Sequence, residues 1–176
     1  EAIEQLIEFC DKQGFEAVGS PAKFYSGFIQ ILKGEMTKGM KDIEKILQRW
    51  IEIDRKPTLC MAYLSLGKLY AQIASGNISV SLKTMLKNFG FIIGNVPTAM
   101  KKAEKYLYRA IEHTNKINAS GLKAQSLLAL GLLYQQKDNK EKAVNCLKEA
   151  IKIFNDHGNY VFLEKAQSAL ESLDVP

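Results

Sequence analysis

The residues that could carry chemistry are few and isolated. The two histidines, His113 and His157, have no Cys, Asp or Glu at a repeating metal-ligand spacing. Gly90 and Gly94 lack the Lys-Ser/Thr pair that completes a phosphate-binding loop, and no Gly-x-Ser-x-Gly elbow occurs. The sequence therefore predicts that this chain is not an enzyme and that it holds no cofactor and no metal.

The cysteines also argue for a structural role. Cys10, Cys60 and Cys146 are odd in number and widely spaced, which disfavours a disulfide framework or a zinc site. We expect buried thiols in a reducing compartment. The chain begins with Glu1 rather than Met, so we expect a fragment of a longer protein. No secretory leader is visible in this sequence, and no apolar run reaches the roughly 18 residues that a membrane span requires.

Positive charge dominates the chain, whose net charge is +5. The densest basic cluster consists of Lys101, Lys102, Lys105 and Arg109, and its i, i+4 spacing places three of them on one helix face. We interpret this face as a solvated outer surface. Nucleic-acid binding through it is a separate hypothesis, but aromatic residues do not interleave with the cluster as a single-strand platform requires.

The elements of the chain follow from its apolar periodicity. Apolar residues recur every three or four positions over 120–136 and 140–155, which predicts two helices joined by a polar turn at 137–139. Gly131 on the first helix and Ala143 on the second leave room for close packing. One helical hairpin cannot bury its apolar face alone, whereas several stacked hairpins can, so the pattern predicts a repeat protein.

The pattern occurs in two earlier segments. Gly27 and Gly39 keep the 12-residue distance that separates Gly131 from Ala143. Gly67 and Ala103 lie 36 residues apart, so 24 residues are inserted between the middle pair of helices, at about 76–99.

The insertion is too apolar for a loop without structure. Its apolar residues predict a short amphipathic helix over 78–89. Pro97 suits the first turn of the helix that follows. The apolar positions of the predicted insertion helix are Ile78, Leu82, Met85, Leu86 and Phe89.

These spacings resemble the tetratricopeptide repeat. The resemblance implies an all-α, right-handed solenoid of antiparallel helix hairpins in a single domain over 1–176. Residues 1–14 would be the second helix of an upstream repeat, 16–54, 57–118 and 120–156 would be three repeats, and 159–173 a closing helix. The third repeat carries the signature at Leu127, Leu130, Gly131, Tyr134, Ala143, Leu147 and Ala150.

The resemblance also places a concave groove along the first helix of each repeat. An exposed apolar patch there needs a cover or a partner. We expect the insertion, with Phe89 and Phe91, to fold back and fill part of the groove; the alternative is a helix from another chain or domain. A single lysine among these positions is not a pattern that binds carboxylates. The groove positions are Met61, Leu64, Lys68 and Ala71 in the second repeat, and Gln125, Leu128, Leu132 and Gln135 in the third.

The order of the motifs is similar to the C-terminal helical region of bacterial proteins with a class III adenylate/guanylate cyclase domain and an NTP-hydrolysing domain. The similar stretches are Gln13-Gly14-Phe15, residues 33–39 and residues 87–97. The resemblance implies a scaffold in cytoplasmic signal transduction whose partner is a protein, a peptide or another domain of the same chain. The alternative function is a ligand- or peptide-sensing module of a transcription regulator. Nucleic acid is not expected as a partner.

Overall fold

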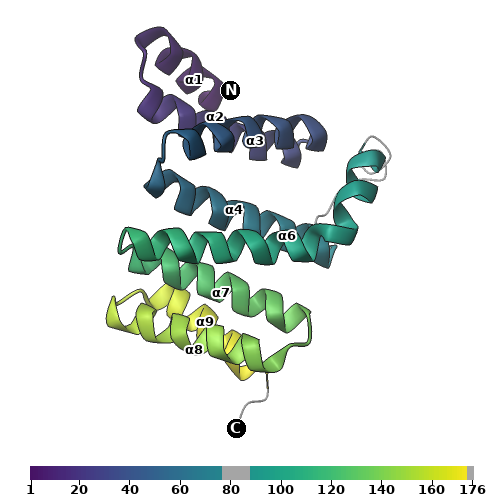
Figure 1. The fold of residues 1–176 in the computed structure, drawn as a ribbon, viewed down its shortest axis with the longest axis vertical. Coiled ribbons are helices and arrows are strands. Elements are labelled where there is room, and N and C mark those ends of the chain that lie inside the picture. Colours follow the sequence, from purple (N-terminus) through teal and green to yellow (C-terminus); the bar gives the residue numbers. More distant parts are fainter. Residues whose placement is uncertain (77–87, 174–176) are drawn as a thin grey trace. The chain divides into compact units, whose positions relative to one another are not determined.

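A computed structural model describes residues 1–76 and 88–173 of the chain (Figure 1). The described ranges contain helices and no strand, which confirms the all-α prediction. None of their helices is long and apolar enough to cross a membrane. The helices are α1 (Ala2–Gln13), α2 (Glu16–Leu32), α3 (Met36–Glu52), α4 (Lys56–Ser75), α6 (Phe89–Lys116), α7 (Ser120–Gln136), α8 (Lys140–Asp156) and α9 (Tyr160–Glu171).

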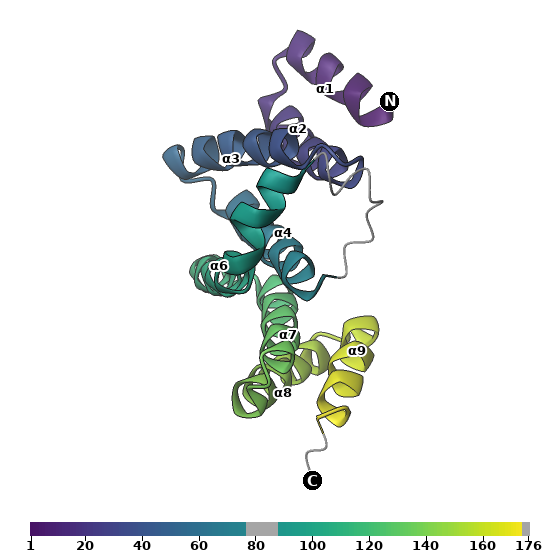
Figure 2. The same ribbon diagram turned by 90° about the vertical axis from the view of Figure 1, so that its right-hand side faces the viewer.

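The helices form two compact units. Of the described residues, the first unit takes in 1–58 and 88–95, and the second takes in 59–76 and 96–173. In the second unit α7 packs against α8, and α9 packs beside α8 (Figure 2). The division of the chain into one domain of three repeats stays a prediction.

Glycines mark the places where paired helices approach closely. In the second unit a Cβ on Gly131 would lie 2.8 Å from Leu147 Cγ, and a Cβ on Gly67 would lie 2.6 Å from the same atom of Leu107. In the first unit Gly27 faces Gly39 across α2 and α3, and a Cβ on Gly27 would lie 2.8 Å from the Gly39 carbonyl oxygen. The close approach that these glycines predict is therefore present at all three places.

The turn between α7 and α8 lies where the sequence predicts it. Asp138 takes the left-handed conformation that ends α7, with φ of 53°. Asn139 then caps α8, because its side-chain oxygen accepts a hydrogen bond from the Lys142 amide at 3.2 Å. The polar turn residues thus satisfy backbone groups that the two helix ends would otherwise leave without partners.

The core of the first unit is aromatic. Phe24 of α2 and Trp50 of α3 are buried, and their ring centroids lie 5.0 Å apart. The indole N–H of Trp50 donates to the hydroxyl of Ser20, which is also buried. This hydrogen bond satisfies the polar end of the tryptophan inside the α2–α3 contact.

Pro97 lies inside α6 and not in its first turn, so that prediction is wrong. Helix α6 begins at Phe89, and Pro97 stands eight residues further on. Proline lacks the N–H that would reach the Ile93 carbonyl, but one missing bond does not end a helix whose other turns are formed. The amphipathic helix predicted over 78–89 lies almost wholly outside the described residues.

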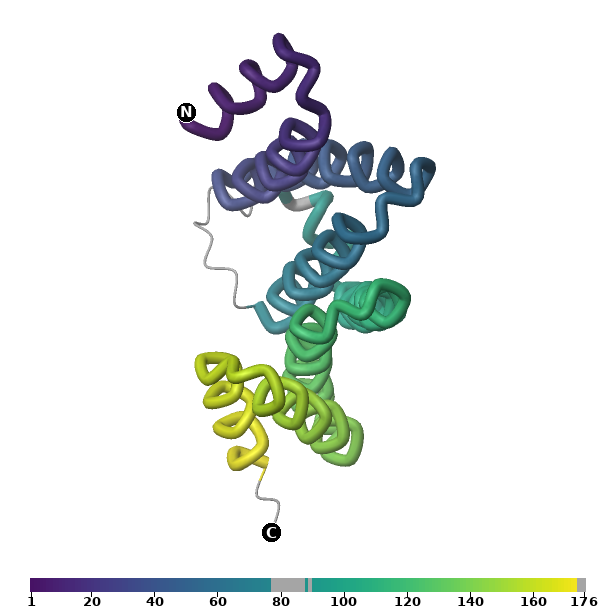
Figure 3. Tube along the Cα trace, turned by 90° about the vertical axis from the view of Figure 1, so that its left-hand side faces the viewer, coloured from purple at the N-terminus to yellow at the C-terminus, as the bar shows by residue number. Residues whose placement is uncertain are grey.

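Asn88, at the end of the insertion, is fixed to the turn between α2 and α3. Its side-chain oxygen accepts from the Met36 amide at 3.1 Å, and its side-chain nitrogen donates to the Gly34 carbonyl at 2.7 Å. Asn88 is 5% exposed, and the start of α6 lies beside the α2–α3 hairpin (Figure 3). This end of the insertion is thus part of the first unit.

Candidate binding groove

A groove in the second unit lies between α4, α7 and α9. Its volume is about 390 Å³, and its floor and walls combine aliphatic side chains, amides and two lysines. Leucines of α7 form the floor, and α9 supplies the only aromatic ring among its described lining residues. The lining residues are Lys68, Ala71, Gln72, Ser75, Gln125, Leu128, Ala129, Leu132, Leu133, Gln136, Phe162 and Lys165.

Five of the groove positions predicted from the sequence line this groove together: Lys68, Ala71, Gln125, Leu128 and Leu132. Leu132 is 40% exposed, so an apolar side chain of the floor is open to solvent. Leu128 is buried beside it. The periodicity of α4 and α7 therefore suffices to bring these side chains to one place.

The remaining predicted site residues lie elsewhere. Met61 is exposed, Leu64 is buried, and neither lines the groove. Gln135 donates its side-chain N–H to the Ser172 hydroxyl at 2.8 Å. Phe91 is partly buried in the first unit, and the side chain of Phe89 is outside the described ones. A binding role for any of the predicted site residues stays a prediction.

Sequence reasoning missed the contribution of α9. Lys165 and Phe162 both line the groove, with the ammonium nitrogen 5.6 Å from the centre of the Phe162 ring. The signal was present in Ala166 and Ala169, whose burial marks the packed face of α9. Phe162 and Lys165 flank that stripe at helical spacing.

The groove is electropositive at its lysine wall. Burial lowers the pKa of Lys68, and the positive charge of Lys165 lowers it further. Among the ion pairs of the described residues, none includes Lys68 or Lys165. Lys165 also lines an adjoining hollow of about 560 Å³, where Glu164 is the acidic residue. The two lysines therefore lack an acidic partner inside the groove itself.

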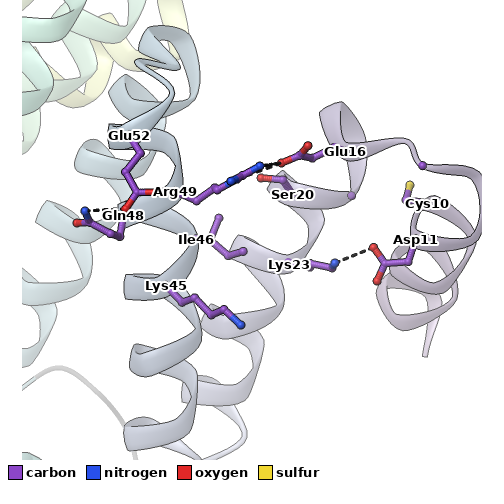
Figure 4. Close-up of a pocket in the computed structure, with 12 residues that line it drawn as sticks. Cys10, Asp11, Glu16, Ser20, Lys23, Lys45, Ile46, Gln48, Arg49 and Glu52 are labelled. Atoms are coloured by element: carbon purple, nitrogen blue, oxygen red, sulfur yellow. Dashed lines mark hydrogen bonds and ion pairs between the residues drawn. The ribbon is translucent and has the colours of Figure 1, made fainter.

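A second pocket lies in the first unit, between α1, α2 and α3 (Figure 4). Its volume is about 610 Å³. Lys23 points to Asp11 with an Nζ–Oδ1 distance of 2.7 Å, and Arg49 points to Glu16 with an Nε–Oε1 distance of 3.5 Å. Two cations of this pocket thus have acidic partners within it, whereas no Asp or Glu occurs among the described lining residues of the α4–α7–α9 groove.

The isolated histidines and cysteines pack as structural residues. His113 lies against the Tyr63 ring at a centroid distance of 5.2 Å, and His157 Nδ1 lies 2.9 Å from the Ile153 carbonyl oxygen. Burial, and then the charge of Glu149, raises the pKa of Cys146 to about 11, which suppresses the reactive thiolate at neutral pH. Among the described residues, no group of three His, Cys, Asp or Glu side chains could hold a metal ion.

Aromatic rings lie beside the basic cluster of α6, but they do not form the open platform that a single strand requires. Lys102 lies over Tyr70 at 5.2 Å and Arg109 over Tyr63 at 5.6 Å, while Tyr106 stacks on both rings. The two tyrosines come from α4, far away in sequence. They are 3% and 2% exposed, so they hold the cations by cation–π contact and offer no open face for a nucleobase.

The comparisons agree with this geometry. Residues 99–156, which cover most of α6 and all of α7 and α8, match the family model of the tetratricopeptide repeat. No curated protein and no solved structure matches the chain. With its paired helices, the chain has an all-α helical repeat fold of the tetratricopeptide-like kind. Such repeats generally mediate protein–protein interaction and are typically not catalytic, and no catalytic family is indicated.

Proposed function

We propose that this chain is a non-catalytic binding module that holds a protein or peptide segment in the groove between α4, α7 and α9. The observation that carries the proposal is the apolar floor of that groove, where Leu132 is 40% exposed beside Leu128. An exposed apolar side chain inside a concave site is stabilised when a partner covers it. The partner is another protein or another domain of the same protein.

The polar rim of the groove suits an extended or helical segment. Gln72, Gln125 and Gln136 can each donate and accept hydrogen bonds, as the backbone of a bound peptide requires. Ser75 adds a hydroxyl at the α4 side. In peptide sites, apolar contacts give affinity and polar groups fix the orientation of the ligand. The apolar floor and the amide rim of this groove can serve these two purposes.

A pair of matched leucine substitutions tests the proposal. Peptides selected from a displayed random library on the whole chain serve as probes, and fluorescence anisotropy measures their affinity. Leu132→Asp is expected to weaken binding about tenfold or more, which is about 1.4 kcal/mol. Leu32→Asp is the control, because Leu32 is 81% exposed on α2, outside the groove. Equal affinity of the two variants would refute binding in this groove.

We further propose that the module belongs to a cytoplasmic signalling protein, with an adenylate/guanylate cyclase as the upstream domain. The support is the resemblance of residues 13–15, 33–39 and 87–97 to the helical regions of such proteins. The complete reading frame tests this context. A cyclase domain before Glu1 would support it, and a DNA-binding domain there would refute it in favour of a transcription regulator.

A ligand-sensing module is the second candidate function. The groove volume of about 390 Å³ falls within the range of small-molecule sites. In that case a small molecule alone raises the midpoint of thermal unfolding, because ligand binding stabilises only the folded chain. Stabilisation by library peptides but by no member of a metabolite panel would count against this candidate.

A further inference from the structure

We infer that the groove recognises an acidic segment of its partner, in which carboxylates lie beside apolar side chains and bind Lys68 and Lys165. The inference rests on the proposed function and specifies the partner's chemistry. Helix α9 then contacts the partner directly, because Lys165 and Phe162 come from that helix.

The first step is geometric. Lys68 of α4 and Lys165 of α9 line the same groove as the apolar Leu128, Leu132 and Phe162. No Asp or Glu occurs among the described lining residues. Glu164 lines the adjoining hollow and is exposed. The groove thus presents positive charge directly next to an apolar floor.

The second step is energetic. Burial and the neighbouring charge of Lys165 lower the pKa of Lys68, so the free groove holds two ammonium groups at some electrostatic cost. A carboxylate placed near both would replace this repulsion with attraction and accept charge-assisted hydrogen bonds. Both lysines are exposed, so a carboxylate of the partner can reach them from solvent.

The third step concerns the alternative occupants. Residues 77–87 of the insertion contain Lys83 and Lys87 and no acidic residue, so their charge is wrong for the lysine wall. A free inorganic anion would satisfy the lysines but leave Leu132 exposed. An acidic and apolar peptide segment matches both features.

The experiment uses the library-selected peptide in three synthetic versions, with Glu, Gln or Lys at its acidic positions, and the whole chain. We expect selected peptides to be enriched in Asp and Glu, and the Glu version to bind about tenfold more tightly than the Gln version. Added salt is expected to weaken binding of the Glu version more than binding of the other two versions. The double variant Lys68→Glu/Lys165→Glu is expected to prefer the Lys version.

The control is Lys148→Glu/Lys152→Glu, which makes the same charge change on exposed positions of α8 outside the groove. It is expected to keep the preference for the Glu version, as is Lys165→Arg. Circular dichroism confirms that each variant is folded, and Lys68→Met replaces the double variant if that variant does not fold. Lys68→Met is expected to weaken binding of the Glu version and to leave binding of the Gln version unchanged.

The outcomes separate the two proposals. Neutral or basic selected peptides that depend on Leu132 would overturn the acidic-partner inference and leave the binding groove intact. Peptides that ignore Leu132→Asp would overturn both. Inorganic phosphate that competes as strongly as the Glu peptide would show an anion site without peptide recognition, and would also overturn the inference.

Discussion

Gly131 and Leu147 show how a single missing side chain sets the distance between two helices. The Gly131 backbone lies so near Leu147 that a Cβ would come within 2.8 Å of its Cγ and 3.4 Å of the Ala143 carbonyl oxygen. Such spacing was predictable from the sequence, because a glycine in the middle of a helix costs about 1 kcal/mol unless close packing offsets it. The position of Lys165 beside Lys68 in the groove was not predictable, because the two residues lie almost a hundred residues apart in the sequence.

Substitution of this glycine tests the close contact. Gly131→Ala is expected to destabilise the chain by about 1–3 kcal/mol, because overpacking outweighs the gain in helix propensity. Gly121→Ala, on the same helix, is the control: a Cβ there meets nothing within 4 Å, so the substitution should stabilise by up to about 1 kcal/mol. Urea unfolding measures both, and stabilisation by Gly131→Ala would contradict the structure.

Glu104 gives a pH-dependent contribution to stability. It accepts hydrogen bonds of 2.6 Å from the Tyr134 hydroxyl and from Lys137. Burial raises the pKa of Glu104, but these hydrogen bonds, with the charges of Lys137 and Lys142, lower it below its ordinary value of 4.5 overall. The folded chain therefore gains stability from ionised Glu104 above pH 4.5, and loses it as the pH falls through the lowered pKa.

Glu104→Gln tests this contribution. It is expected to cost about 1–2 kcal/mol at pH 7, and the difference from the unchanged chain should shrink as the pH falls below about 4.5. Glu141→Gln, on the exposed side of α8, should change stability by less than about 0.5 kcal/mol. A difference for Glu104→Gln that stays constant from pH 7 to pH 3 would show that ionisation of Glu104 is not involved.

At the scale of whole elements, helix boundaries were predicted best where local signals agree. The turn at 137–139 combines polar residues, a left-handed Asp138 and the cap Asn139, so periodicity and turn chemistry indicate the same boundary. The start of α6 was predicted too late. Asn95 and Pro97 are local helix breakers, but the backbone continues as a helix from Phe89, because propensity is a weak prior that tertiary context overrides.

The attachment of Asn88 to the start of α3 leads to an element-scale prediction. Asn88→Ala leaves the buried Met36 amide and Gly34 carbonyl without this side chain, so it should cost about 1–3 kcal/mol and speed hydrogen exchange at the start of α3. Asn139→Ala removes a cap with one hydrogen bond, so it should cost about 1 kcal/mol and act on α8. Unchanged exchange at Met36 in Asn88→Ala would refute the attachment.

At the scale of the whole molecule, the groove could be predicted only in part. Helical periodicity gave its α4 and α7 walls, because residues that face one side of a helix recur at fixed spacing. The α9 wall depends on how that helix packs on α7 and α8, which periodicity within α9 alone does not specify. The excess of positive charge extends beyond the groove to the whole second unit. Lys and Arg outnumber Asp and Glu in that unit, whereas the two classes nearly balance in the first.

The chain divides into two compact units, so we expect damage to the core of one unit to act mainly on that unit. Leu147→Ala in α8 and Leu47→Ala in α3 remove the same atoms from buried sites in different units, at an expected cost of about 2–5 kcal/mol each. Repeat arrays are stabilised by local terms, and local opening follows the weakened segment. Hydrogen exchange followed by mass spectrometry should therefore show faster exchange mainly in 96–173 for Leu147→Ala and mainly in 1–58 for Leu47→Ala. Equal acceleration of both ranges by either variant would show instead that the chain opens in one cooperative step.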